Sequence, residues 1–337
     1  MFAPVLSSES STARLADFAF GARPTRSAAE LPEPRNCLEM WWQAVALGGA
    51  GHYAAARVVL RRLSASTTDP VLLSLAASTE GSFLRQLGRH ARAAHADGRA
   101  AVLVLPRLSG AHVEPPGPAR SGAVDRGGIG TTTHDTSSSS SDTSSSYSRV
   151  PDLVDAAADA MIGLAADALG TGRLAVATRL LDRCTALLRP AARPPAGGGV
   201  PGPDSAGTER SRALVRLHWV RAETALASGR GADAAVEAGA ALTLAESGPS
   251  IRHQVKSRLL VAAATSVTGE MGRAAELAVL VDDQCRVSGL LPLRWACAML
   301  RTGLAAPGVS QDSARADAEA CRALITQRGG RFHDSGH

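Results

Sequence analysis

A spacing of glycine and alanine that recurs five times along the chain is the feature that most constrains its fold. In each repeat an alanine follows a glycine by five residues, and alanine or glycine precedes the same glycine by seven residues. The glycines are Gly51, Gly88, Gly172, Gly229 and Gly269. Glycine readily adopts the positive φ at which many helices end, and small residues let two paired helices cross closely. The pattern therefore predicts five helical hairpins, each of which turns at its glycine.

The composition favours helices over sheets. Apolar residues make up 45% of the chain but aromatic residues only 3%, so the core is expected to consist mainly of alanine, leucine and valine. Alanine is the strongest helix former, and the β-branched and aromatic runs that favour strands are scarce. A single hairpin leaves one apolar face uncovered, which a stacked neighbour buries. The predicted fold class is all-α, made of stacked α-α hairpins.

The segment from Trp41 to Pro70 resembles one tetratricopeptide repeat, a helical unit of about 34 residues. The residues that carry the resemblance are Trp41, Ala44, Gly51, Tyr53, Ala56, Leu60 and Pro70. The chain departs from the family at the tryptophan of the first helix, whose place is taken by Met40, Ala77, Met161, His218 and Arg258. The resemblance implies a right-handed, tetratricopeptide-like solenoid whose first helices line a concave face.

Residue usage also indicates the type of genome. Lys256 is the only lysine in a chain with 36 lysine and arginine residues, a bias typical of high-GC organisms such as actinobacteria. The stretch from Gly289 to Trp295 is similar to helical repeat regions of large actinobacterial transcriptional regulators, although no ATP-binding or helix-turn-helix segment accompanies it.

Changes in composition divide the chain into helical blocks and inserts. Segments rich in Pro, Gly, Ser and Thr bury too little apolar area to offset the entropy lost on ordering. The predicted organisation is a flexible arm at 1–36, hairpins 1–2 at 37–106, a disordered insert at 107–150, hairpin 3 at 151–188, a Pro/Gly-rich loop at 189–210, hairpins 4–5 at 211–288, a helical hairpin cap at 289–328 and a tail at 329–337.

The resemblance also implies which residues line the concave groove. With the glycines as the register, these positions are Ser82, Arg85, Gln86, Arg216, Trp219, Glu223 and Lys256. Their mixture of polar, basic and aromatic side chains suits an acidic or amphipathic segment of another protein. The favoured hypothesis is therefore a non-catalytic scaffold or adaptor that binds a peptide or helix.

Two alternative functions remain open at this stage. The stretch Arg57–Arg126 is basic within a chain of net charge +5, so a regulator associated with nucleic acid is the second hypothesis. The third hypothesis is an enzyme with an unrecognised site between hairpins, but no sequence motif supports it. His90 and His95 lie five residues apart, off a shared helix face, and do not match the spacing of a metal-binding helix. No cofactor or metal is expected.

The cysteine pattern and the lengths of the apolar runs indicate the expected cellular localisation. The five cysteines are odd in number and form no C-x-x-C pair, which favours reduced, buried thiols. No signal peptide is recognisable, and no run reaches the roughly 18 apolar residues of a membrane helix. The expected localisation is the cytoplasm.

Overall fold

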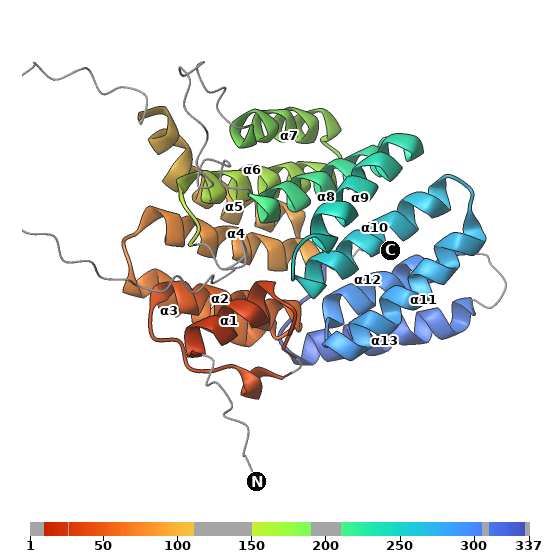
Figure 1. Cartoon of the computed structure of the whole chain (residues 1–337), viewed down its shortest axis with the longest axis horizontal. Helices are drawn as coiled ribbons and strands as arrows, with labels where there is room; N and C mark the ends of the chain where they lie inside the picture. Colours follow the sequence, from red (N-terminus) through yellow and green to blue (C-terminus); the bar gives the residue numbers. More distant parts are fainter. Residues whose placement is uncertain (1–9, 26, 111–149, 190–209, 305–309, 334–337) are drawn as a thin grey trace, which may run out of the picture.

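The computed structural model describes residues 10–25, 27–110, 150–189, 210–304 and 310–333 (Figure 1). Within these ranges the regular structure is helical and contains no strand, which confirms the all-α prediction. Most of the predicted inserts at 107–150 and 189–210 lie outside the described residues.

The helices of the described ranges follow each other in the order that the hairpin pattern predicts. Their bounds are α1 (Ser11–Phe20), the short 3-10 helix η1 (Ala28–Glu30), α2 (Cys37–Gly49), α3 (Tyr53–Ser66), α4 (Pro70–Gln86), α5 (His90–Gly110), α6 (Leu153–Gly170), α7 (Leu174–Leu188), α8 (Ser211–Ala227), α9 (Gly231–Glu246), α10 (Ile251–Val267), α11 (Met271–Ser288), α12 (Leu291–Thr302) and α13 (Gln311–Gln327).

The five predicted turns lie between α2 and α3, α4 and α5, α6 and α7, α8 and α9, and α10 and α11. All five turn glycines have positive φ, between 71° and 95°. The alanines five residues further on are completely buried where the paired helices meet: Ala56, Ala93, Ala177, Ala234 and Ala274. The small residues seven positions before each glycine are buried too: Ala44, Gly81, Ala165, Ala222 and Ala262. The hairpin prediction is therefore confirmed.

Local sequence explains where several helices begin. The Asn36 side chain accepts a hydrogen bond from the Glu39 amide at the start of α2. Asp152 and Asp155 form a reciprocal capping box on α6, which satisfies two backbone donors that a helix start otherwise leaves unpaired. Pro70 occupies the first turn of α4, where its missing N–H costs no helical hydrogen bond.

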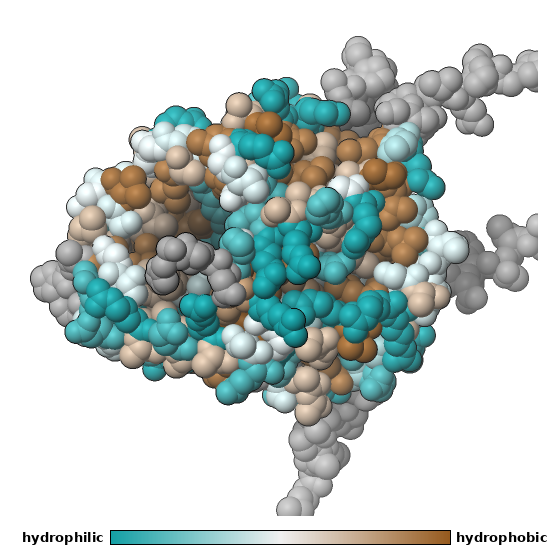
Figure 2. Space-filling view, turned by 180° about the vertical axis from the view of Figure 1, so that it is seen from behind, coloured by the Kyte–Doolittle hydropathy of each residue, from teal (hydrophilic) through white to brown (hydrophobic). Residues whose placement is uncertain are grey.

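The end of the chain returns to the first hairpin (Figure 1). The Ala54 amide donates to the carbonyl of Arg328 at 2.9 Å, and the Arg328 guanidinium donates to the carbonyl of Ala50 at 2.8 Å. Further along, the His333 amide donates to the carbonyl of Leu87 at 2.8 Å. Helix pairs far apart in sequence thus meet. A space-filling view from behind shows a hollow in the surface of the protein (Figure 2).

The two ends of the chain differ from the expected flexible arm and tail. Residues 11–20 form α1, which Ser10 caps and which buries Leu15 and Phe20 in the main core. Near the other end, the Phe332 ring packs on Trp295 with centroids 4.9 Å apart. Local composition suggested unstructured ends, but an apolar face on each segment is covered by helices distant in sequence.

Smaller expectations are corrected or confirmed. Trp41 and Trp42 are both buried. Helix α5 continues through Pro106 to Gly110 rather than ending at residue 106. All five cysteines are free and four are buried, as predicted. Among the described helices, none has the length and apolar character needed to cross a membrane.

Candidate functional site

Helix α1 packs along α2 and touches α10 at its end, where the Arg212 side chain of α8 also contacts Phe20. Helices α2, α8 and α10 are the first helices of three hairpins, and their residues around Phe20 form one face. We call this the inner face. Four rings form a row along it: Trp41 and Phe20 are 5.4 Å apart, Phe20 and His253 6.1 Å, and His253 and Trp219 5.3 Å. Phe20, which comes from α1, is only 5% exposed. The inner face therefore already holds a helix with an aromatic side chain at its centre.

Arginines flank these rings. The Arg212 guanidinium lies 5.5 Å from the centroids of both Phe20 and Trp41, and that of Arg252 lies 5.7 Å from Phe20. A guanidinium over a ring at this distance is attracted by the negative face of the π system. Arg252 also donates to the carbonyls of Val45 at 2.9 Å and Ala19 at 2.6 Å, near the ends of α2 and α1.

Each arginine of the inner face has a hydrogen-bond or ion-pair partner within the chain. Asp159 pairs with Arg212 at 2.7 Å and with Arg216 at 3.1 Å. Burial lowers the pKa of Arg252 to about 10, with smaller contributions from Arg216 and Arg212. Burial together with the nearby arginines holds the pKa of His253 well below its ordinary value, so its imidazole is neutral.

The seven predicted groove residues do not form one open surface. Trp219, Glu223 and Lys256 do come together: the Lys256 amine lies 2.5 Å from the Glu223 carboxylate and 5.9 Å from the Trp219 ring centroid. The Trp219 indole donates to the Ser257 hydroxyl at 2.8 Å. Arg216 is held by Asp159, as described above. These side chains are thus engaged with partners inside the chain.

The remaining predicted residues lie near the end of α4. The Tyr53 hydroxyl donates to Gln86 Oε1 at 2.9 Å, and the Gln86 amide donates to Ser82 at 3.2 Å. Arg85 donates to Asp97 and, at 3.2 Å, to Asp167. Ser82, Arg85 and Gln86 thus lie together on α4. Burial mainly lowers the pKa of Arg216, and the charge of Arg85 is close enough to contribute to this lowering.

Arg85, Asp97 and Asp167 form a buried charge cluster that joins α4, α5 and α6. Both carboxylates are 0% exposed. A side-chain carbon at Gly81 or Gly163 would collide with the Asp97 carboxylate, which explains glycine at both positions inside helices. Burial raises the pKa of Asp167 to about 7 and also raises the pKa of Asp97, against the attraction of Arg85.

This cluster was not predicted from the sequence. The sequence signal that could have indicated it is the presence of Gly81 and Gly163 inside helices, together with Asp97 in an alanine-rich segment. A proton shared by two carboxylates is a chemical feature of many active sites. Here, however, both carboxylates are sealed from solvent by helix packing, so the cluster serves to hold three helices together.

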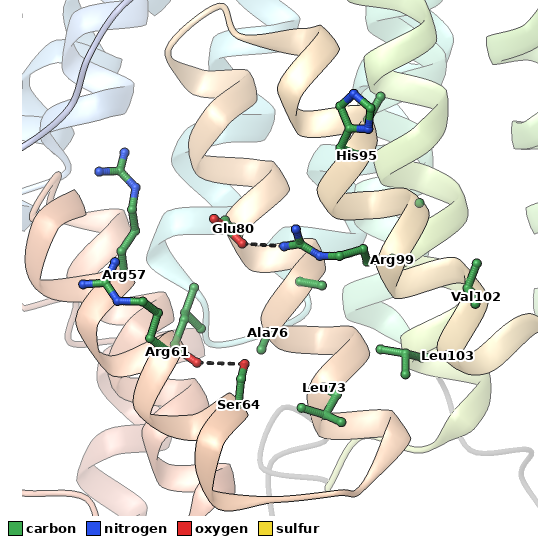
Figure 3. Close-up of a pocket in the computed structure, with 14 residues that line it drawn as sticks. Arg57, Arg61, Ser64, Leu73, Ala76, Glu80, His95, Arg99, Val102 and Leu103 are labelled. Atoms are coloured by element: carbon green, nitrogen blue, oxygen red, sulfur yellow. Dashed lines mark hydrogen bonds and ion pairs between the residues drawn. The ribbon is translucent and has the colours of Figure 1, made fainter.

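An open groove runs along the opposite side of the first two hairpins (Figure 3). It lies between α3 and α5, with α4 as its floor, and has a volume of about 950 Å³. We call it the outer groove. Its lining consists of Arg57, Leu60, Arg61, Ser64, Leu73, Ala76, Ala77, Glu80, Ala94, His95, Gly98, Arg99, Val102 and Leu103.

The spacing of the lining residues follows from helix geometry. Positions 57, 60, 61 and 64 of α3 fall on one helix face, as do 94, 95, 98, 99, 102 and 103 of α5. The floor is small and apolar, since it is formed by Ala76 and Ala77 with Leu73 at one end. Val102 lies on the wall and is 73% exposed, which is unusually open for a valine.

The charged side chains of the outer groove are only partly matched. Arg99 pairs with Glu80 at 2.8 Å, and Glu80 is the single carboxylate of the lining. Partial burial lowers the pKa of Arg57, with smaller contributions from Arg61 and Arg331 in the same direction. The Arg57 guanidinium donates instead to the carbonyl of Gly329 at 3.0 Å. The lining thus contains three guanidinium groups and one carboxylate, and Arg61 is the most exposed of the charges left over. The groove lies inside the stretch Arg57–Arg126 that the sequence marked as basic, although its apolar lining was not predicted.

The described residues contain no group of His, Cys, Asp or Glu side chains arranged to hold a metal ion. Comparison of the chain with models of protein families, with curated proteins and with solved structures finds no match. Fold and site together define an all-helical protein of packed hairpins with an open, partly apolar groove.

Proposed function

We propose that this chain is a non-catalytic module that binds an α-helical segment of another protein in the outer groove. The observation that carries the proposal is the groove itself: about 950 Å³ between two neighbouring helices, over a floor of small apolar residues. An amphipathic helix laid into such a groove contacts it through residues spaced three and four apart. The volume is in the range of about 300–1,000 Å³ that is common for binding pockets.

The proposal keeps the binding mode expected from the sequence but moves the binding site. We infer that the hairpins form a tetratricopeptide-like array. On the inner face, which we take as the counterpart of the expected concave groove, Phe20 of α1 occupies the space between Trp41 and His253, and the arginines are held by Asp159 and backbone carbonyls. The outer groove carries the exposed apolar wall that a partner would bury.

The proposal is tested by titrating the full chain with a fluorescently labelled, designed amphipathic helix of Leu, Ala and Glu and following anisotropy. Val102→Asp places a charge on the apolar wall and should weaken binding about tenfold or more, since burial of an unpaired carboxylate costs well over 1.4 kcal/mol. Val236→Asp on α9 is the matched control, because Val236 is 72% exposed and lies outside the groove.

Saturable binding that Val102→Asp weakens and Val236→Asp leaves unchanged would support the proposal. Absence of saturable binding, or equal losses in the two variants, would exclude the outer groove as a helix-binding site.

A second candidate function, association with nucleic acid, is favoured by one observation. Arg57, Arg61 and Arg99 lie along the same groove, and Glu80 is the one carboxylate of its lining. We rank it lower because phosphates would leave the apolar floor uncovered. Such binding should weaken steeply as salt is raised, because counterions are released from the nucleic acid.

A further inference from the structure

The outer groove has different chemistry at its two ends (Figure 3). Arg57, Arg61, His95 and Arg99 lie toward one end, where α3 and α5 begin. Leu73, Val102 and Leu103 lie toward the other end, so the walls change from cationic to apolar along the groove. An occupant with uniform chemistry along its length would suit only one half of this surface.

The directions of the helices add to the polarity. Helices α3 and α5 run the same way along the groove, and α4 runs the opposite way beneath them (Figure 3). The amino ends of α3 and α5 therefore both lie toward the cationic end. A helix carries a partial positive charge at its amino end and a partial negative charge at its carboxyl end. The carboxyl end of α4 lies at the same end and offsets part of this effect, so the two amino ends and the arginines together leave a net preference for negative charge there.

Gly98 permits a close approach at the middle of the groove. It lies inside α5, where glycine lowers helix stability relative to alanine. A side-chain carbon at this position would meet no atom within 4 Å, and φ is not positive, so nothing in the described chain requires glycine there. Together with Ala77 and Ala94, it leaves room for the backbone of a docked helix.

We propose that the occupant of the outer groove is an amphipathic helix of another protein that has acidic residues in its last turn and lies antiparallel to α3 and α5. Its carboxyl end lies beside the exposed Arg61 and Arg99, and its apolar stripe covers Ala77 and Leu103. This inference rests on the proposed function and adds the charge and direction of the partner.

The exposed ion pair of Arg99 and Glu80 affects how strongly an acidic helix would bind. Their side chains are 64% and 40% exposed, so the pair itself adds little to stability. A carboxylate from the partner would compete with Glu80 for Arg99. Replacing Glu80 by glutamine removes the one negative charge of the lining, and it should tighten binding of an acidic helix severalfold.

The test compares two labelled peptides of identical composition. One carries three glutamates in its last turn after an apolar, alanine-rich stripe, and the other has the reversed sequence. We expect the first to bind the full chain about tenfold more tightly, because rim charges and helix dipoles both favour it. Arg61→Glu, at an exposed position, should remove most of that preference.

Substitutions at Gly98 test the site of contact. Gly98→Leu should abolish binding of the acidic peptide, because the side chain would occupy the middle of the groove. Gly239→Leu is the matched control, since Gly239 lies inside α9 and also has open space beside it. Circular dichroism of both variants verifies that the helices remain intact.

Each outcome decides between defined alternatives. Equal affinity for the two peptides would overturn the charge and direction but leave the helix-binding function standing. Loss of binding in Gly239→Leu as well as in Gly98→Leu would overturn the contact at Gly98. If neither peptide binds while a labelled single-stranded DNA 12-mer binds with steep salt dependence, both proposals fall in favour of nucleic acid.

Discussion

The inner face and the outer groove both combine arginines with apolar side chains, but they differ in how the arginines are satisfied. On the inner face, Arg212 and Arg216 share Asp159, and Arg252 donates to carbonyls near the ends of α1 and α2. In the outer groove Arg99 pairs with Glu80 and Arg57 donates to the carbonyl of Gly329 at 3.0 Å, whereas Arg61 is exposed to solvent. Buried charge is costly unless it is paired, whereas exposed charge is solvated at little cost. Arginines without a partner in the chain therefore cost little only on a surface that water reaches, such as one that another protein would bind.

Helix α1 accounts for much of this difference. It packs on α2 and inserts Phe20 between Trp41 and His253. No described helix covers the outer groove in the same way, so Val102 stays exposed there. The comparison teaches that residues of similar type are structural on one side of the hairpins and available on the other.

The largest expected effect tests whether the buried charges are structural. Arg85→Met leaves Asp97 and Asp167 buried without their cation, and should lower the free energy of unfolding by about 3–5 kcal/mol at pH 8. The loss should be smaller at pH 5, where the carboxylates accept protons. Urea denaturation monitored by circular dichroism measures both values. A loss under about 1 kcal/mol at pH 8 would show that the cluster contributes little.

A second test concerns the helix that covers the inner face. Phe20→Ala should lower the free energy of unfolding by about 3 kcal/mol, because it leaves a cavity among aromatic rings. Phe18→Ala is the control on the same helix; Phe18 is only half-buried, and its removal should cost clearly less. Equal losses in chemical denaturation would mean that Phe20 has no special place on the inner face.

The pH dependence of stability provides a third test. The pKa of Asp167 is raised from 3.8 to about 7, so the folded state holds a proton that the unfolded chain releases. The resulting stabilisation is complete below about pH 4 and is lost as the pH rises through 7, by roughly 2–4 kcal/mol at 1.4 kcal/mol per pKa unit. Asp167→Asn should flatten this part of the profile. An unchanged slope between pH 4 and 8 would assign the dependence to other groups.

The smallest effect sharpens the comparison at the groove. Gly98→Ala should raise the free energy of unfolding by about 0.5–1 kcal/mol, because alanine favours the helix and meets no neighbour. The same change should weaken binding of the acidic peptide. Gly81→Ala is the opposite control, since its side chain would collide with Asp97 and should destabilise the protein. Thermal unfolding of both variants measures the contrast, and a destabilising Gly98→Ala would contradict the open space described.

The sequence by itself determined the hairpins. Positive φ at Gly51 and the burial of Ala56 depend on residues within one hairpin, so the spacing of glycine and alanine predicts them directly. Helix starts such as that of α6 follow from capping residues for the same reason. For the outer groove, the sequence predicted only the basic character, because arginines such as Arg57 and Arg99 can be recognised as charged without knowledge of the fold.

Only the tertiary structure decided which surface is covered and which is open. The Ile251 amide donates to the carbonyl of Gly21, and the Ala54 amide to that of Arg328, across most of the chain length. Helix periodicity marks an apolar face but does not name the segment that covers it. That choice depends on the shapes of surfaces far apart in sequence, and it left the inner face filled by α1 and the outer groove free.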